Sequence, residues 1–157
     1  MAALFKGDFT MNINQSTRNM LTNMGVGIGV DRAAATLANE TIAFFTVTGQ
    51  IQITALYGIM TVIGGANTGG WQHNPTAGAT VSLNVATDFN AAIVGDVLGI
   101  SGVLGTALTW GGAVVGMMQP IIVNAGDIEW ISSAEEGTIT THIRYLPLSL
   151  DANVTVA

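Results

Sequence analysis

The chain has 157 residues, of which 49% are hydrophobic and only 9% are charged. This balance excludes an intrinsically disordered protein, and it disfavours a free cytosolic monomer because so few charges cannot coat a small domain. The formal charge is −6, the four Lys and Arg residues are dispersed and cysteine is absent, so we expect no direct nucleic-acid binding, no disulfides and no thiolate metal site.

The first 36 residues differ in texture from the rest of the chain. Asn and Gln alternate with Met, Ile and Leu without a clean period, and there is too little apolar surface for a separate core. Ser16 or Thr17 can cap a short helix, and residues 31–38 can form at most two helical turns. We therefore predict an extended N-terminal arm over residues 1–36 and one domain over residues 37–157.

Strand patterns follow the arm. Residues 42–48 are rich in β-branched and aromatic side chains, and residues 51–57 alternate between apolar and polar side chains. Residues 59–63 are apolar on both faces. The glycine-rich residues 64–70 predict a loop, which is expected to continue as an irregular excursion over residues 71–75.

Further strands are predicted in the second half of the chain. Residues 80–85 alternate, so that Val81, Leu83 and Val85 are expected to face inward. The clearest strand covers residues 138–145, whose alternation is typical of an antiparallel strand with one solvent-exposed face. The other predicted strands are short and lie at residues 97–101, 107–110, 114–117, 121–123 and 127–131.

Short strands separated by turns, with no convincing helix among them, predict the fold class. We expect an all-β protein, in which an antiparallel β-sandwich or jelly-roll-like domain carries the extended N-terminal arm. No internal repeat of fixed period is visible in the sequence.

Charged residues are absent from two long stretches, residues 41–87 and residues 97–126. Charged side chains are disfavoured at the centres of interfaces, because stripping water from an unpaired ion is costly. The two stretches therefore predict surfaces that meet another subunit. The alternative is that Thr, Asn, Gln and Ser solvate them.

Residues 97–118 also allow a membrane helix, because 22 uncharged residues are long enough to span a bilayer. Gly112 and Gly116 have the spacing seen where membrane helices pack. However, six glycines divide the stretch, and no Lys or Arg flanks it. Short strands are favoured, and a small membrane-inserted protein is the minor alternative.

The sequence offers little catalytic chemistry. Its two histidines, His73 and His142, are not spaced as a chelating pair. Acidic pairs occur at residues 135–136 in a predicted turn and at Asp127 and Glu129 on one strand face, where solvent exposure is expected. We therefore predict no catalytic, metal-binding or cofactor-binding residues and no enzyme activity.

Aromatic residues are the better candidates for function. Trp71 and Trp110 lie in glycine-rich, uncharged segments, Phe5 and Phe9 lie in the predicted arm, and His73 lies beside Trp71 in the predicted loop. Large aromatic side chains on exposed segments anchor partner surfaces. We predict these five residues as interface residues, the alternative being that each aromatic side chain folds back over its own core.

Residues 124–130, followed by residues 137–148, resemble the closing hairpin of small virion structural proteins of tailed bacteriophages. In that group the last strand ends in Tyr-x-Pro-Leu and a short tail follows. Residues 45–58 and 73–78 resemble the opening strands and the loop of the same group. The resemblance covers residues 41–151.

This resemblance implies a capsid decoration (cement) protein on the outer surface of the virion. Such a protein forms homo-oligomers, here most simply a trimer, and ties subunits of the major capsid protein together. No catalytic residues accompany the resemblance, and neither direct nucleic-acid binding nor a membrane is implied. A tail or head-fibre structural component is the alternative of the same class.

Overall fold

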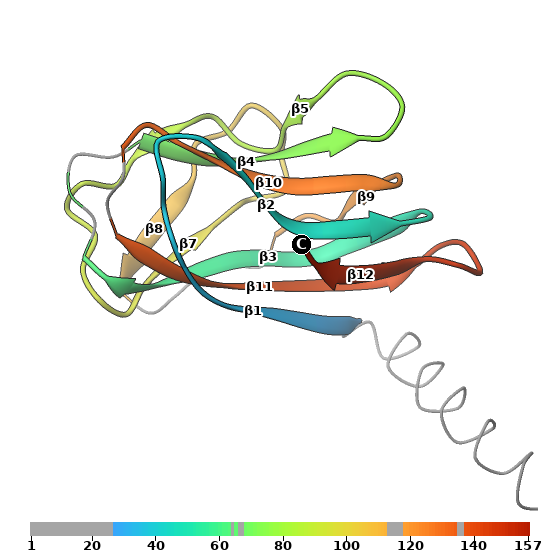
Figure 1. The fold of residues 1–157 in the computed structure, drawn as a ribbon, viewed down its shortest axis with the longest axis horizontal. Coiled ribbons are helices and arrows are strands. Elements are labelled where there is room, and N and C mark those ends of the chain that lie inside the picture. The colour runs from blue at the N-terminus through green and yellow to red at the C-terminus, as the bar shows by residue number, and fades with distance from the viewer. Residues whose placement is uncertain (1–26, 64, 66–67, 113–117, 135–136) are drawn as a thin grey trace, which may run out of the picture.

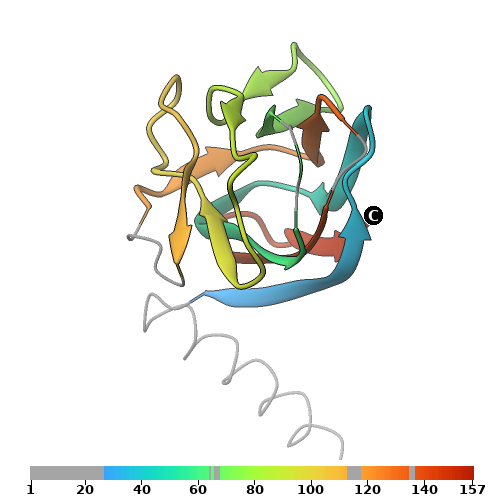
Figure 2. The ribbon, with the colours of Figure 1, turned by 90° about the vertical axis from the view of Figure 1, so that its left-hand side faces the viewer.

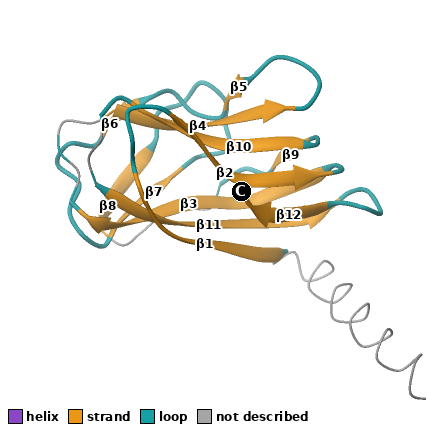
Figure 3. Ribbon diagram, in the orientation of Figure 1, coloured by secondary structure: helices purple, strands orange, loops and turns teal. Residues whose placement is uncertain are grey.

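The computed structural model describes residues 27–63, 65, 68–112, 118–134 and 137–157. These residues form twelve strands and no helix (Figure 1 and Figure 3), which confirms the predicted all-β class. The strands are β1 (Ile28–Thr36), β2 (Thr41–Thr48), β3 (Ile51–Val62), β4 (Thr68–Pro75), β5 (Val81–Ser82), β6 (Thr87–Asp88), β7 (Asp96–Gly99), β8 (Thr109–Gly112), β9 (Ile121–Val123), β10 (Gly126–Ser132), β11 (Thr138–Pro147) and β12 (Asn153–Val156).

Two antiparallel sheets pack face to face, which confirms the predicted β-sandwich. The first sheet has the order β1-β11-β3-β7-β8, and β9 also pairs with β3. The second sheet has the order β12-β2-β10-β4-β5, and β6 also pairs with β4. Figure 2 looks along the strands and shows the two layers enclosing the interior. The edge strands β1 and β12 lie next to each other and border one side of the sandwich.

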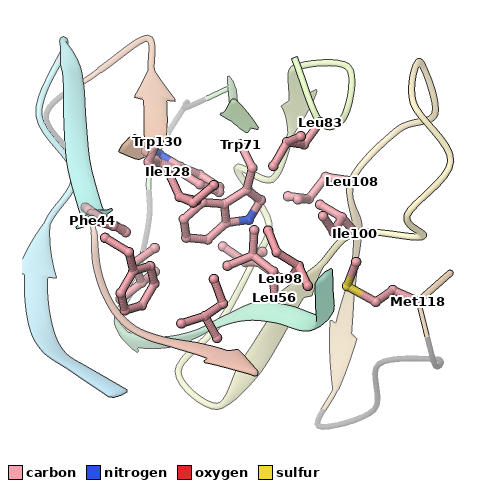
Figure 4. Packing of buried hydrophobic residues seen from close by; sticks show 14 of the residues in the cluster. Phe44, Leu56, Trp71, Leu83, Leu98, Ile100, Leu108, Met118, Ile128 and Trp130 are labelled. Carbon is pink, nitrogen blue, oxygen red and sulfur yellow. The ribbon is translucent and has the colours of Figure 1, made fainter. Parts of the chain in front are cut away.

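The hydrophobic core lies between the sheets, with Trp71 of β4 near its centre (Figure 4). The Trp71 ring meets the rings of Phe44 and Trp130 edge to face, at centroid distances of 5.5 Å and 4.8 Å. Each such aromatic pair contributes about 0.5–1.5 kcal/mol beyond the burial of its area. Aliphatic side chains surround this aromatic group; Leu56 and Leu98 come from β3 and β7, and Leu83, Ile100 and Leu108 come from connections next to strands.

The predicted strand at residues 138–145 is confirmed as β11, which extends to Pro147. β11 pairs with β3 on one side and with β1 on the other, so it lies inside its sheet. Its inward side chains, including Ile139 and Ile143, are buried, whereas Arg144 on the other face is exposed. The strands predicted near residues 42–48, 51–63, 97–101, 107–110, 121–123 and 127–131 also correspond to observed strands.

Residues 28–36 are extended, but as strand β1 of the sandwich, so their assignment to an arm is wrong, and so are the helical turns predicted from residue 31 to residue 36. They pair with β11 from Ile28 opposite Tyr145 to Thr36 opposite Thr138. Sheet pairing overrides the local helix preference of the alanines here, since β11 offers a free row of backbone groups. The guanidinium of Arg32 also packs over the Phe44 ring at 4.2 Å. The predicted short helix before residue 24 lies outside the described residues.

The predicted loop and excursion are also wrong for residues 68–75, which form β4 between β10 and β5. Glycine at position 69 serves side-chain packing instead of a turn. A Cβ atom there would overlap the Trp130 ring, so glycine lets this ring approach the β4 backbone closely.

The predicted strand at residues 80–85 is shortened to β5, and its predicted inward pattern is only partly correct. Leu83 is buried, whereas Val81 and Val85 are exposed. Both residues of β5 are exposed. After Leu83 the pattern is interrupted by Asn84, which is buried and accepts a hydrogen bond of 2.7 Å from the Trp71 backbone N–H. Because Leu83 and Asn84 are neighbours and both are buried, the side chains do not alternate between the two faces here as they do in a regular strand.

Two further details differ from the expectations. β10 and β11 lie in opposite sheets, so residues 124–130 and 137–148 do not form a hairpin. The short strand β12, which pairs with β2, was not predicted. The strand predicted at residues 114–117 lies outside the described residues.

The minor alternative of a membrane helix is wrong for residues 97–112, which form β7, β8 and the loop between them. In the part of the chain that the structure describes, no helix is long and apolar enough to cross a membrane.

Candidate interaction surfaces

Two of the five predicted interface residues are buried inside the sandwich. Trp71 is 1% exposed and His73 is 6% exposed, and both lie on the inward face of β4. Their predicted role as surface anchors is therefore wrong. Phe5 and Phe9 lie outside the described residues, so their role stays a prediction. Trp110 is 38% exposed and remains a candidate.

His73 is buried with only one ring nitrogen satisfied. Its Nδ1 lies 3.2 Å from the backbone oxygen of Asp127 and, because that oxygen can only accept, Nδ1 carries the proton. Nε2 is buried and has no hydrogen-bond partner in the described part of the chain. Burial lowers the pKa of His73, against the opposing effect of this backbone hydrogen bond and of the negative charges of Asp127 and Glu129.

Trp110 lies on β8, which is an edge strand of the first sheet. It pairs with Leu98 of β7, and the far side of β8 has no neighbouring strand among the described residues. Unpaired backbone groups beside a part-exposed indole can accept another chain.

Along β2 and β3, the first uncharged stretch presents neutral polar side chains on the outer sheet faces. Thr46 and Thr48 of β2 and Thr61 of β3 are exposed, and Gln52 and Thr54 of β3 are half-buried. The absence of charge along these strands is therefore compatible with contact to water. An interface has to be located from exposed apolar side chains instead.

Four exposed aliphatic side chains gather at the end of the sandwich where β3 ends and β7 begins. We call Val62, Ile63, Ile93 and Val94 the apolar end; each side chain is between 54% and 60% exposed. The backbone N–H of Gly95 donates to the Met60 oxygen at 2.9 Å, which holds the turn at residues 93–96 against the end of β3. The two pairs thus lie at the same end of the sandwich, although they come from separate parts of the sequence.

The turn that carries Ile93 and Val94 is braced by its own hydrogen bonds. The Asp96 carboxylate is buried and accepts a hydrogen bond of 2.9 Å from the Ile93 N–H, and the Asp96 N–H donates to the Ile93 oxygen at 3.0 Å. Asp96 therefore faces its own turn and leaves the apolar end uncharged. Glu40, before β2, and Asp88, at the end of β6, are exposed carboxylates at the same end of the sandwich.

The opposite end of the sandwich is also exposed but more polar. Leu148 and Leu150 are exposed in the connection from β11 to β12. Ser149 lies between the two leucines in the sequence, and Asp151 follows them. The Ser149 hydroxyl donates a hydrogen bond to the Asp151 carboxylate at 3.0 Å and accepts one from the Gln50 N–H at 3.0 Å. The apolar side chains at this end are therefore separated by hydrogen-bonded and charged groups.

Asp127 and Glu129 lie on the outer face of the second sheet. The expected solvent exposure is wrong for Glu129, which is buried, and Asp127 is half-buried. The Glu129 carboxylate accepts hydrogen bonds from the side-chain amides of Gln72 and Asn74, so it is satisfied by neighbours on β4. Asp127 accepts from the Thr46 hydroxyl at 2.8 Å. Among the described residues, no group of three or more His, Asp or Glu side chains is placed to hold a metal ion.

The second histidine lies on the outer face of the first sheet. His142 Nδ1 is 2.8 Å from the Asp31 carboxylate, and the imidazole stacks on the Tyr57 ring at a centroid distance of 4.9 Å. The cluster joins β1, β11 and β3, so it fastens the edge strand β1 to the sheet.

Sequence reasoning missed the apolar end. The pattern of residues 59–63 predicts a strand but no surface, and the side chains at positions 93 and 94 follow no period that would mark them. Only the pairing of β3 with β7 places them together. Comparison of the chain with protein-family models, with curated proteins and with solved structures found no match.

Proposed function

We propose that this chain is a structural protein of a bacteriophage particle and not an enzyme. The function that we favour is capsid decoration: a homo-oligomer, most simply a trimer, that binds the major capsid protein on the outer surface of the virion. The resemblance of residues 41–151 to small virion proteins, apart from the closing hairpin that the sheet order does not contain, supports this proposal, and the antiparallel β-sandwich is compatible with it.

The observation that carries the proposal is the apolar end on a chain with very few charges. Val62, Ile63, Ile93 and Val94 are each more than half exposed. Contiguous exposed apolar side chains rimmed by polar residues mark protein–protein contact sites. Burying them against other subunits would stabilise the shell by mass action, because disassembly would then require breaking additional contacts.

Purified particles test the proposal directly. Cryo-electron microscopy together with quantitative mass spectrometry would locate the chain and count its copies. Capsid decoration predicts hundreds of copies on the outer surface of the shell. A few copies at one vertex or along the tail would replace capsid decoration by the tail or head-fibre role, and absence from particles would overturn the proposal.

A further inference from the structure

Segment 1–26, the part of the chain that precedes Gly27, joins the sandwich at the end opposite to the apolar end. Ile28, two residues after the segment, pairs with Tyr145 near the C-terminal end of β11. Val62 of β3 lies opposite Thr138, at the other end of β11. The nine residues of β1 span about 30 Å between these two ends.

The composition of segment 1–26 suits contact with an apolar surface. It contains Phe5, Phe9 and four of the seven methionines of the chain. Methionine side chains are unbranched and adapt to irregular apolar surfaces. Aromatic and Met side chains are also enriched at the buried centres of protein interfaces.

Charge also favours contact between segment 1–26 and another part of the protein. The segment contains Lys6 and Arg18 against Asp8, a formal charge of +1. Because the whole chain carries −6, residues 27–157 carry −7. The exposed carboxylates at the same end as the apolar side chains would attract the segment without interrupting an apolar contact.

The point at which segment 1–26 joins the sandwich favours docking on a neighbouring copy over docking on its own apolar end. To reach its own apolar end, segment 1–26 would have to reverse and run back along the sandwich. A copy placed end to end presents its apolar end without such a reversal. Twenty-six residues extend to about 85 Å, so the segment has enough length to reach that copy.

We propose that segment 1–26 of one copy docks on the apolar end of a neighbouring copy. The contact is heterologous, because it joins two different surfaces, and it closes into a ring when the rotation between copies divides a full turn. The proposal deepens the self-association part of the proposed function. It does not depend on the phage assignment, because the purified chain alone is sufficient to test it.

Cysteine cross-linking tests the contact in the full-length protein, because the chain has no native cysteine. One protein carries Phe9→Cys, a second, ¹⁵N-labelled protein carries Val94→Cys, and the mixture is treated with a short bismaleimide. A matched control replaces the second protein by Leu150→Cys, an exposed position at the opposite end. The experiment is repeated with Phe5→Cys in place of Phe9→Cys, because a different part of the segment can lie beside position 94.

Linked peptides are identified by mass spectrometry. The proposal predicts a link between position 9 or 5 and position 94 in the mixture, at least tenfold more abundant than the link to position 150. Equal abundance of the two links would overturn it. A link that forms only within one chain of a Phe9→Cys/Val94→Cys double variant would also overturn it, and would show that the segment covers its own sandwich.

Discussion

The interior of the sandwich and the apolar end consist of similar side chains, but only the interior is completed by its own chain. Trp71 is enclosed by aromatic and aliphatic side chains from both sheets, whereas Ile63 and Val94 contact solvent. Substitutions in the interior should therefore change folding stability. Substitutions at the apolar end should change association and leave folding nearly unchanged.

The largest effect is expected from Trp71→Ala. Removing this ring leaves a cavity beside Phe44 and Trp130, so we expect a loss of about 3–5 kcal/mol in the free energy of unfolding. Chemical denaturation followed by circular dichroism measures it. The matched control is Trp110→Ala at the part-exposed edge, for which a much smaller loss is expected. Equal losses would contradict the contrast between interior and surface.

The next largest effect is expected from Ile63→Glu combined with Val94→Glu. Two carboxylates at the apolar end should weaken self-association at least tenfold, which corresponds to about 1.4 kcal/mol, because unpaired charges would be buried in the contact. The free energy of unfolding of the separated subunit should change by less than about 0.5 kcal/mol, since both side chains are exposed. Sedimentation velocity and denaturation of the diluted protein measure the two quantities.

Leu150→Glu is the control for this double variant, since Leu150 is exposed at the opposite end. We expect no change in its association. If Leu150→Glu weakened association as much as the double variant does, then added negative charge, and not the apolar end, would be the cause of the effect.

A smaller, pH-dependent effect is expected from His73→Gln. Burial lowers the pKa of His73 in the folded state, so the unfolded chain binds the proton more readily. The free energy of unfolding should therefore be independent of this titration above the unfolded-state pKa of about 6.5. Below that pH it should fall, by at most about 1.4 kcal/mol per pH unit, because the unfolded chain takes up the proton first. Unfolding measured from pH 7.5 to 5.5 should show a smaller slope for His73→Gln than for the native chain.

The smallest effect is expected from Asp31→Asn. The Asp31 carboxylate is 74% exposed, so its contact with His142 resembles a surface ion pair. Such pairs contribute about 0.2–1 kcal/mol, and added salt weakens them further. Hydrogen exchange of the β1 amides should increase slightly in this variant. A loss as large as that of Trp71→Ala would contradict the view that core packing, and not this pair, holds the sandwich.

The strands with regular alternation could be predicted from the sequence because their environment is regular. β11 lies between two strands and has one face on the core, so its side chains alternate as that position requires. β1 could not be predicted in this way. Its alanine-rich residues have no strong strand preference, and they are extended because the edge of β11 pairs with them.

The candidate surfaces could be predicted less well than the fold. Trp71 and Trp110 lie in similar glycine-rich, uncharged sequence, yet one is central and the other lies at an edge. The difference comes from sheet order, which places β4 between two strands and β8 at a border. The apolar end depends in the same way on the pairing of β3 with β7, a contact between distant residues that local pattern does not encode.

The mass of the purified full-length protein in solution tests the central claim most directly. Sedimentation equilibrium at tens of micromolar should give a multiple of the 16.2-kDa chain mass, about three times for the favoured trimer. Under the same conditions the Ile63→Glu/Val94→Glu variant should give a lower mass, shifted toward that of one chain. A single-chain mass for the native protein, or an unchanged multiple for the variant, would contradict the assignment of the apolar end as the interaction surface.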